Sequence, residues 1–159
     1  MQTQTPDRFS GIHHISTMPF IMRDCVELLC GMKLGSGQFR DVYQCNIIRN
    51  AVVKVSTEPQ ANWCEYNVWQ SVADQKYAKW FAPVLWISPG GHLLIMQKAR
   101  MLKYEDKKPA KIPSFFTDLK LSNFGWIGKQ LVCTDYQFIT RAIDIAFGAN
   151  FRKFELIES

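Results

Sequence analysis

The chain has 159 residues, of which 47% are hydrophobic and 21% charged, and it carries a formal net charge of +5. This composition is that of a globular protein and excludes the disordered and fibrous classes. No apolar run approaches the roughly 20 residues of a membrane helix, and the polar start lacks a basic region followed by an apolar core. The five cysteines form no C-x-x-C pair, which argues against a disulfide framework and a zinc site. We therefore expect a cytoplasmic protein of one domain or two small lobes, without a secretory signal or a membrane partner.

The positive charge is concentrated in residues 98–111, where six basic residues stand beside two acidic ones. Such a run is either a solvated linker or a patch that faces an anionic partner or the phosphates of a ligand. Nucleic acid is not the favoured partner, because no aromatic residues alternate with the lysines.

The first half of the chain alternates between helical and strand patterns. Residues 1–19 predict a flexible arm, and residues 20–31 carry apolar side chains at helical spacing as far as Gly31. Residues 32–55 predict three short strands, with turns at Gly35–Gly37 and at Arg49–Asn50. A second helix is predicted within residues 60–76, and residues 82–99 predict an antiparallel pair of strands.

The second half shows less regular pattern. Residues 98–111 have no clean periodicity and predict a hinge and basic linker. Residues 126–136 predict a hairpin around Gly128–Lys129, and residues 138–147 predict a helix.

The order of these elements predicts an α+β fold rather than alternating β/α units. Residues 20–97 would form a five-stranded, mostly antiparallel unit with one inserted helix. Residues 98–111 would join it to a small second unit, residues 112–159.

Two glycines and one lysine stand out in the first unit. Gly35 and Gly37 lie in a predicted turn, where glycine lets backbone amides approach phosphate oxygens, although a plain hairpin explains the same pattern. Lys54 ends an apolar strand, where a lysine is costly unless it pairs with a charge. Glu65 on the following helix is the candidate partner. Alternatively, the Lys54 side chain extends to solvent and Glu65 lies on its helix without pairing with the lysine.

Four polar residues stand out in the second unit. Asp118, Lys120 and Asn123 have a spacing that can orient a hydroxyl nucleophile and hold a metal ion beside a nucleotide. Asp135 ends a predicted hairpin strand and, with Asn123, makes a candidate Mg²⁺ site. Each feature also has a local explanation, because one Asp or Asn suffices for a surface turn and Asp135 can cap a strand.

Taken in order, these signals resemble the protein-kinase-like superfamily over residues 33–137. The resemblance implies a protein-kinase-like fold, with a five-stranded N-lobe and a minimal C-lobe. It also implies that ATP lies under the glycine turn, with Lys54, paired to Glu65, on its α- and β-phosphates. The remaining implied roles are adenine contacts from the backbone of Gln97, Lys98 and Ala99, catalysis by Asp118 and Lys120, and Mg²⁺ ligation by Asn123 and Asp135.

The chain departs from the kinase pattern at several positions. Arg40 stands at the third glycine, Phe116 and Thr117 replace the His-Arg before the catalytic Asp, and Gln137 replaces a glycine. Only 17 residues separate the hinge from Asp118, and 24 follow Asp135. The chain thus resembles the compact kinase-like proteins of phages and bacteria more than a regulated signalling kinase, and a phage-encoded protein would work in the host cytoplasm.

The resemblance implies a Mg-ATP-dependent phosphotransferase that moves the γ-phosphate to a hydroxyl, as Ser/Thr-type protein kinases do. The acceptor stays open between a protein, a small molecule and the chain itself. The alternative is a pseudokinase that binds a nucleotide or a partner protein and acts as an inhibitor or interaction module. A third option is transfer of another part of a nucleotide bound in reverse. Because so small a second unit buries little core, we also expect a protein partner or self-association.

Overall fold

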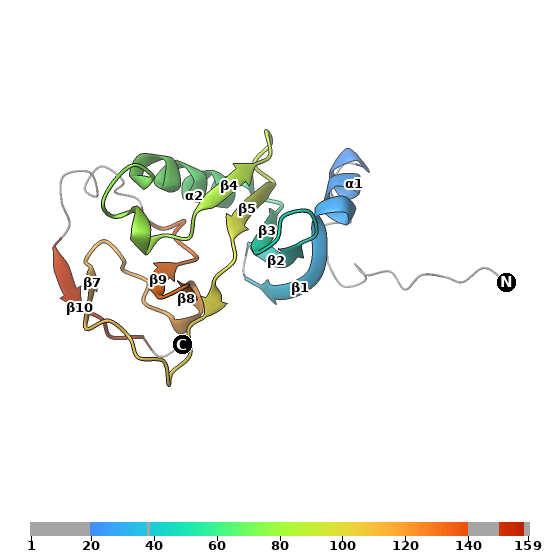
Figure 1. Ribbon diagram of the computed structural model, residues 1–159. Helices are drawn as coiled ribbons and strands as arrows, with labels where there is room; N and C mark the ends of the chain where they lie inside the picture. Colours follow the sequence, from blue (N-terminus) through green and yellow to red (C-terminus); the bar gives the residue numbers. More distant parts are fainter. Residues whose placement is uncertain (1–19, 38, 140–149, 158–159) are drawn as a thin grey trace.

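The computed structural model describes residues 20–37, 39–139 and 150–157 (Figure 1). The predicted arm, residues 1–19, lies outside these residues, as does most of the helix predicted at 138–147. The described residues form an α+β structure, in which a five-stranded antiparallel sheet with two α-helices adjoins a smaller unit of short strands. No helix within these ranges is long and apolar enough to cross a membrane.

The main sheet has the strand order β1-β2-β3-β5-β4, and every neighbouring pair is antiparallel. The predicted five-stranded unit is therefore confirmed. Its central strand β3 is buried at every position, which suits its β-branched sequence. The predicted turn before β3 is also present, with Asn50 at a φ of 58°. The strands are β1 (Cys30–Ser36), β2 (Arg40–Cys45), β3 (Ala51–Ser56), β4 (Val84–Ile87) and β5 (Leu93–Gln97).

Each face of the sheet has its own hydrophobic cluster, because alternate residues of a strand point to opposite faces. Val53 belongs to the cluster that contains Val26 of helix α1 (Phe20–Leu29). Val52 belongs to the cluster that contains Val68 of helix α2 (Pro59–Val72). Lys54 has the same parity as Val52 and therefore faces α2.

Helix α1 is shorter than predicted. It ends at Leu29, two residues before the expected stop at Gly31, because the chain has already entered β1 at Cys30. Cys30 pairs with Cys45 of β2, so strand pairing rather than a glycine cap ends this helix.

The second unit consists of two small sheets. Strands β6 (Arg100–Met101), β8 (Phe124–Ile127) and β9 (Gln130–Cys133) form an antiparallel sheet of three, and β8 and β9 are the predicted hairpin. Strand β7 (Lys111–Pro113) pairs with β10 (Phe151–Lys153) at the other end of the unit (Figure 1). Strand β10 was not predicted, because a three-residue strand carries no periodic pattern.

Most of residues 98–111 lies outside helices and strands, but the segment is not without structure. Strand β6 lies inside this range and β7 begins at its end, and Asp106 organises the turn between them. The Asp106 carboxylate accepts hydrogen bonds from Arg100 (3.1 Å), the Lys103 amide (2.9 Å) and Trp126 Nε1 (3.1 Å). These bonds, led by the one from Arg100, hold the pKa of Asp106 at about 2. The basic segment 98–111 thus contains an acidic residue, Asp106, whose hydrogen bonds hold the turn within it.

The two units share one hydrophobic core. The ring of Phe81 lies 5.1 Å from those of Phe116 and Tyr136, measured between centroids. The Ala82 amide donates a hydrogen bond to the Cys133 carbonyl (2.9 Å), which joins the segment before β4 to the end of β9. Because so small a second unit would bury little surface alone, we infer that both units fold as one body.

Gly125 of β8 allows a close approach between the hinge and the hairpin. A Cβ atom at Gly125 would lie 2.7 Å from the Arg100 carbonyl oxygen and 2.8 Å from Ala99 Cβ. We expect Gly125→Ala to lower the free energy of unfolding by about 1–3 kcal/mol, because the backbone has to move. Gly35→Ala is the control, since a Cβ there meets no atom within 4 Å. Denaturant titration compares the variants, and equal stabilities would contradict the close approach.

Candidate functional site

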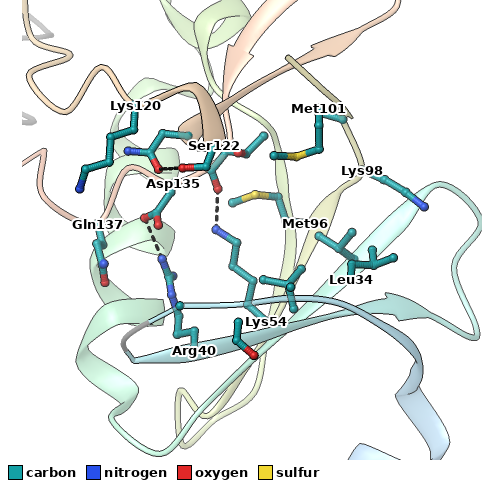
Figure 2. A pocket seen from close by; sticks show the side chains of 18 of the residues that line it. Leu34, Arg40, Lys54, Met96, Lys98, Met101, Lys120, Ser122, Asp135 and Gln137 are labelled. Atoms are coloured by element: carbon teal, nitrogen blue, oxygen red, sulfur yellow. Dashed lines mark hydrogen bonds and ion pairs between the residues drawn. The ribbon is translucent and has the colours of Figure 1, made fainter. Parts of the chain in front are cut away.

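A cleft of about 630 Å³ lies between the five-stranded sheet and the second unit (Figure 2). Pockets of this size take cofactors and drug-sized ligands. Of the predicted site residues, Glu65 alone does not line the cleft; it is fully buried against Lys54. The others all line it, namely Gly35, Gly37, Lys54, Gln97, Lys98, Ala99, Asp118, Lys120, Asn123 and Asp135.

The cleft has a mainly apolar side and a charged side (Figure 2). Leu34, Met96 and Met101 lie on one side together with Lys98, whereas Arg40 and Asp135 meet on the other. Such a division suits a ligand that has an apolar body and an anionic end.

Lys54 and Glu65 form the predicted ion pair. Lys54 Nζ lies 2.9 Å from Glu65 Oε1 and 2.8 Å from Oε2, and it also donates to the Thr134 carbonyl (2.5 Å). The pairing follows from local structure, because Lys54 is on the α2 face of β3 and Glu65 is on the buried side of α2. Lys54 is only 5% exposed, so the alternative of a lysine that reaches solvent is wrong.

Arg40 is a second cation in this cluster and was missed by the sequence analysis. It is 6% exposed and lies 2.8 Å from Glu65 Oε2, through Nη1, and 2.8 Å from Asp135 Oδ1, through Nη2. The sequence analysis registered Arg40 only as a missing glycine. No local pattern signalled this role, because the partners Glu65 and Asp135 lie 25 and 95 residues away in the sequence.

The shared carboxylate is ionised in the folded protein. Burial raises the pKa of Glu65, but the charges and hydrogen bonds of Lys54 and Arg40 outweigh burial and bring this pKa below its ordinary value. For Arg40, burial lowers the pKa, and Glu65 and Asp135 more than reverse that effect. For Lys54, burial and the nearby charge of Arg40 prevail over Glu65, so the lysine pKa is lowered.

The Asp118–Asn123 spacing has a direct structural use. Asn123 Nδ2 donates to the Asp118 carbonyl oxygen (3.2 Å) and to Asp118 Oδ2 (2.9 Å), which fixes the carboxylate in the cleft wall. Asn123 closes the 3-10 helix η3 (Leu121–Asn123), and its carbonyl accepts from the Thr134 amide (2.8 Å). Lys120 Nζ lies 3.4 Å from Asp118 Oδ2 on the same loop. The loop therefore presents an oriented carboxylate beside a lysine.

The donor set fits a magnesium ion in part. Asn123 Oδ1 and the Asp135 carboxylate are hard oxygen ligands of the kind that Mg²⁺ prefers, and both residues line the cleft. One Asp135 oxygen is already paired with Arg40. Within the described ranges, no group of three His, Cys, Asp or Glu residues is placed to hold a metal. Asn123 and Asp135 would therefore hold Mg²⁺ together with water or ligand oxygens.

The hinge and the glycine turn are only partly free to bind a ligand. The Gln97 amide donates to the Pro83 carbonyl (2.9 Å) and the Lys98 amide to the Asn50 carbonyl (2.8 Å). Adenine contacts from these two residues would thus use their carbonyl oxygens or side chains. At the other wall, the Gly37 amide donates to the Arg40 carbonyl (2.7 Å), which closes the turn between β1 and β2.

Residues 150–157 support the Asp118 loop from behind, which the sequence analysis did not predict. Arg152 donates to the Phe116 carbonyl, and the Ile157 amide donates to the Leu119 carbonyl (3.0 Å). The Phe154 ring packs 5.3 Å from that of Phe124, between centroids. The carbonyls of Phe116 and Leu119, on either side of Asp118, are therefore bound by the Arg152 side chain and the Ile157 amide.

Lowering the pH should reduce the free energy of unfolding, because Glu65 becomes protonated. Because the folded pKa of Glu65 lies below 4.5, its ion pairs stabilise fully above pH 4.5 and lose this effect as pH falls through the folded value. Glu65→Gln removes the titration and costs about 3–5 kcal/mol near neutral pH, because buried Lys54 loses its carboxylate partner and Arg40 keeps only Asp135. Urea denaturation across pH should show a steeper acid loss in the wild type than in E65Q. The exposed Glu58→Gln is the control, and parallel profiles for wild type and E65Q would contradict the assignment.

The amide of Ile157 should be needed to order the Asp118 loop. Ile157→Pro removes the donor to the Leu119 carbonyl and should cost about 1 kcal/mol of stability. Ile157→Ala keeps the amide, and the side chain is half exposed, so it serves as the matched control. Hydrogen exchange of residues 118–123 should be faster in I157P than in I157A. Identical exchange would show that this contact does not hold the loop.

Comparison of the chain with models of known protein families finds no match, and comparison with curated proteins finds none either. Its function is therefore inferred from the chemistry of the cleft.

Proposed function

We propose that this chain is a protein-kinase-like phosphotransferase that moves the γ-phosphate of ATP to a hydroxyl group. The proposal rests on one observation, namely that two separate groups of charged residues meet in one cleft. The Lys54–Glu65 pair enters from the sheet, and the Asp118 loop, oriented by Asn123, enters from the second unit. They come from distant parts of the chain, in the order that the kinase resemblance requires.

The division of the cleft supports ATP as the ligand. The apolar side, with Leu34, Met96 and Met101, offers a surface for a flat base next to the hinge. Lys54 is placed between this side and Asp135, where it can neutralise phosphate oxygens. Gly35 and Gly37 line the same cleft, where the absence of a side chain lets a phosphate approach the backbone.

Asp118 is the residue that we assign to the acceptor. Its carboxylate lines the cleft, is held by Asn123, and can accept the proton of an incoming hydroxyl. Lys120, on the same loop, can stabilise charge on the transferred group. When bound, Mg²⁺ would neutralise phosphate charge, with Asn123 and Asp135 as its protein ligands.

One observation favours a second candidate, a pseudokinase that binds nucleotide or a partner without transfer. Asp135, the strongest candidate for a metal ligand, is paired with Arg40. A cleft that already has a cation at this carboxylate has less need of Mg²⁺, and transfer without a metal is slow in this class of chemistry. Measured transfer separates the two candidates.

Asp118→Asn should separate binding from transfer. The substitution keeps the shape of the side chain, so nucleotide affinity should stay within a few-fold. Loss of a positioned base should lower transfer by about 100-fold or more. Binding is measured by titration calorimetry, and transfer by incubation with γ-labelled ATP and Mg²⁺, alone and with a cell lysate. Asp74→Asn, exposed and outside the cleft, is the control.

One result would count against the enzyme, and another against the role of Asp118. If the wild type binds ATP and transfers no label to itself or to any lysate component, the pseudokinase candidate replaces it. If D118N transfers as fast as the wild type and D74N, Asp118 is not the base.

A further inference from the structure

Arg40 is a charged feature of the cleft that neither the kinase resemblance nor the proposed reaction uses. It lies at the start of β2, directly after the glycine turn, and its guanidinium enters the charged side of the cleft (Figure 2). At this position the kinase pattern has a glycine, which has no side chain to place there.

The guanidinium is fixed in place rather than mobile. Nη1 contacts Asn62 Oδ1 (3.4 Å) and Glu65 Oε2 (2.8 Å), and Nη2 contacts Glu65 Oε1 (3.2 Å) and Asp135 Oδ1 (2.8 Å). Both terminal nitrogens therefore have two partners each, which accounts for all four of their hydrogens. A cation held this way acts as a permanent part of the site.

Arg40 changes the charge balance of the phosphate side. Lys54, Arg40, Glu65 and Asp135 together sum to zero, and Asp118 and Lys120 offset each other on the facing loop. With glycine in place of Arg40, the first group would carry one negative charge. A polyphosphate would then be repelled by Asp135 unless a divalent cation covered that carboxylate.

We propose that Arg40 supplies the positive charge that neutralises Asp135 for nucleotide binding, a role that a divalent cation would otherwise have, so that the cleft binds a nucleoside triphosphate with similar affinity in the presence and absence of Mg²⁺. This inference rests on the proposed nucleotide site and adds a property to it. A metal would then affect the transfer step rather than the binding of nucleotide. The ligand class is a nucleoside di- or triphosphate without its usual metal.

The test compares nucleotide affinity with and without metal, using a non-hydrolysable β,γ-imido analogue of ATP. Titration calorimetry with the full chain is done in Mg²⁺ and in EDTA. We expect the wild-type Kd to change by less than about 3-fold between the two. For Arg40→Gln, which keeps a polar side chain but is shorter and loses the charge, we expect the Kd in EDTA to rise by about 10-fold or more, and to recover in Mg²⁺.

Arg40→Lys restores a positive charge without the planar fork, and thermal unfolding checks that each variant folds. We expect R40K to be less dependent on metal than R40Q. A wild-type Kd that rises 10-fold or more in EDTA overturns the inference without need of any variant, and so does an R40Q variant that loses affinity equally in both buffers, because Arg40 would then be only structural.

These outcomes are distinct from failure of the proposed function. Binding that requires Mg²⁺ overturns the role of Arg40 and leaves the phosphotransferase intact. Binding that is independent of Mg²⁺, with no transfer, supports the role of Arg40 in a pseudokinase. No nucleotide binding in either buffer overturns both.

Discussion

The buried carboxylate of Glu65 determines how the parts of this protein are placed. It is fully buried and accepts hydrogen bonds from Lys54 on β3, from Arg40 on β2 and from the Tyr136 amide (3.1 Å) after β9. A carboxylate taken out of water costs several kcal/mol unless such partners replace the lost water. Because its donors come from three separate segments, helix α2 cannot shift against the sheet or against the second unit without leaving a buried charge unpaired.

The geometry of the cleft follows from these contacts of Glu65. Tyr136, whose amide contacts Glu65, also donates its hydroxyl to the Ala82 carbonyl (2.8 Å) and packs against Phe81. The segment that carries Asp135 is therefore tied to the α2 face of the sheet by packing and by hydrogen bonds at once. Lys54 and Asp135 are in position before any ligand arrives, and groups that are already oriented need little reorganisation to stabilise charge.

Sequence patterns predicted the parts of this site that depend on local structure. Lys54 stood out because a lysine in a valine-rich strand needs a partner, and helical spacing put Glu65 on the side that could supply one. Arg40 was missed because its partners Glu65 and Asp135 are 25 and 95 residues away, and no local pattern connects them. The β7–β10 pair was missed for a similar reason, since each strand has only three residues.

The small second unit explains how the Asp118 loop can be ordered without a large helical lobe. The loop is fixed at the Phe116 and Leu119 carbonyls by residues 150–157, and at Asp118 by Asn123. These contacts hold the Asp118 carboxylate in one position. Among the described residues, the elements around the loop are short strands, which do not form a broad surface. Under the proposed function, the described residues therefore offer little surface to the residues around the acceptor hydroxyl. Selection of the acceptor then depends on its fit into the cleft or on a partner that brings it there.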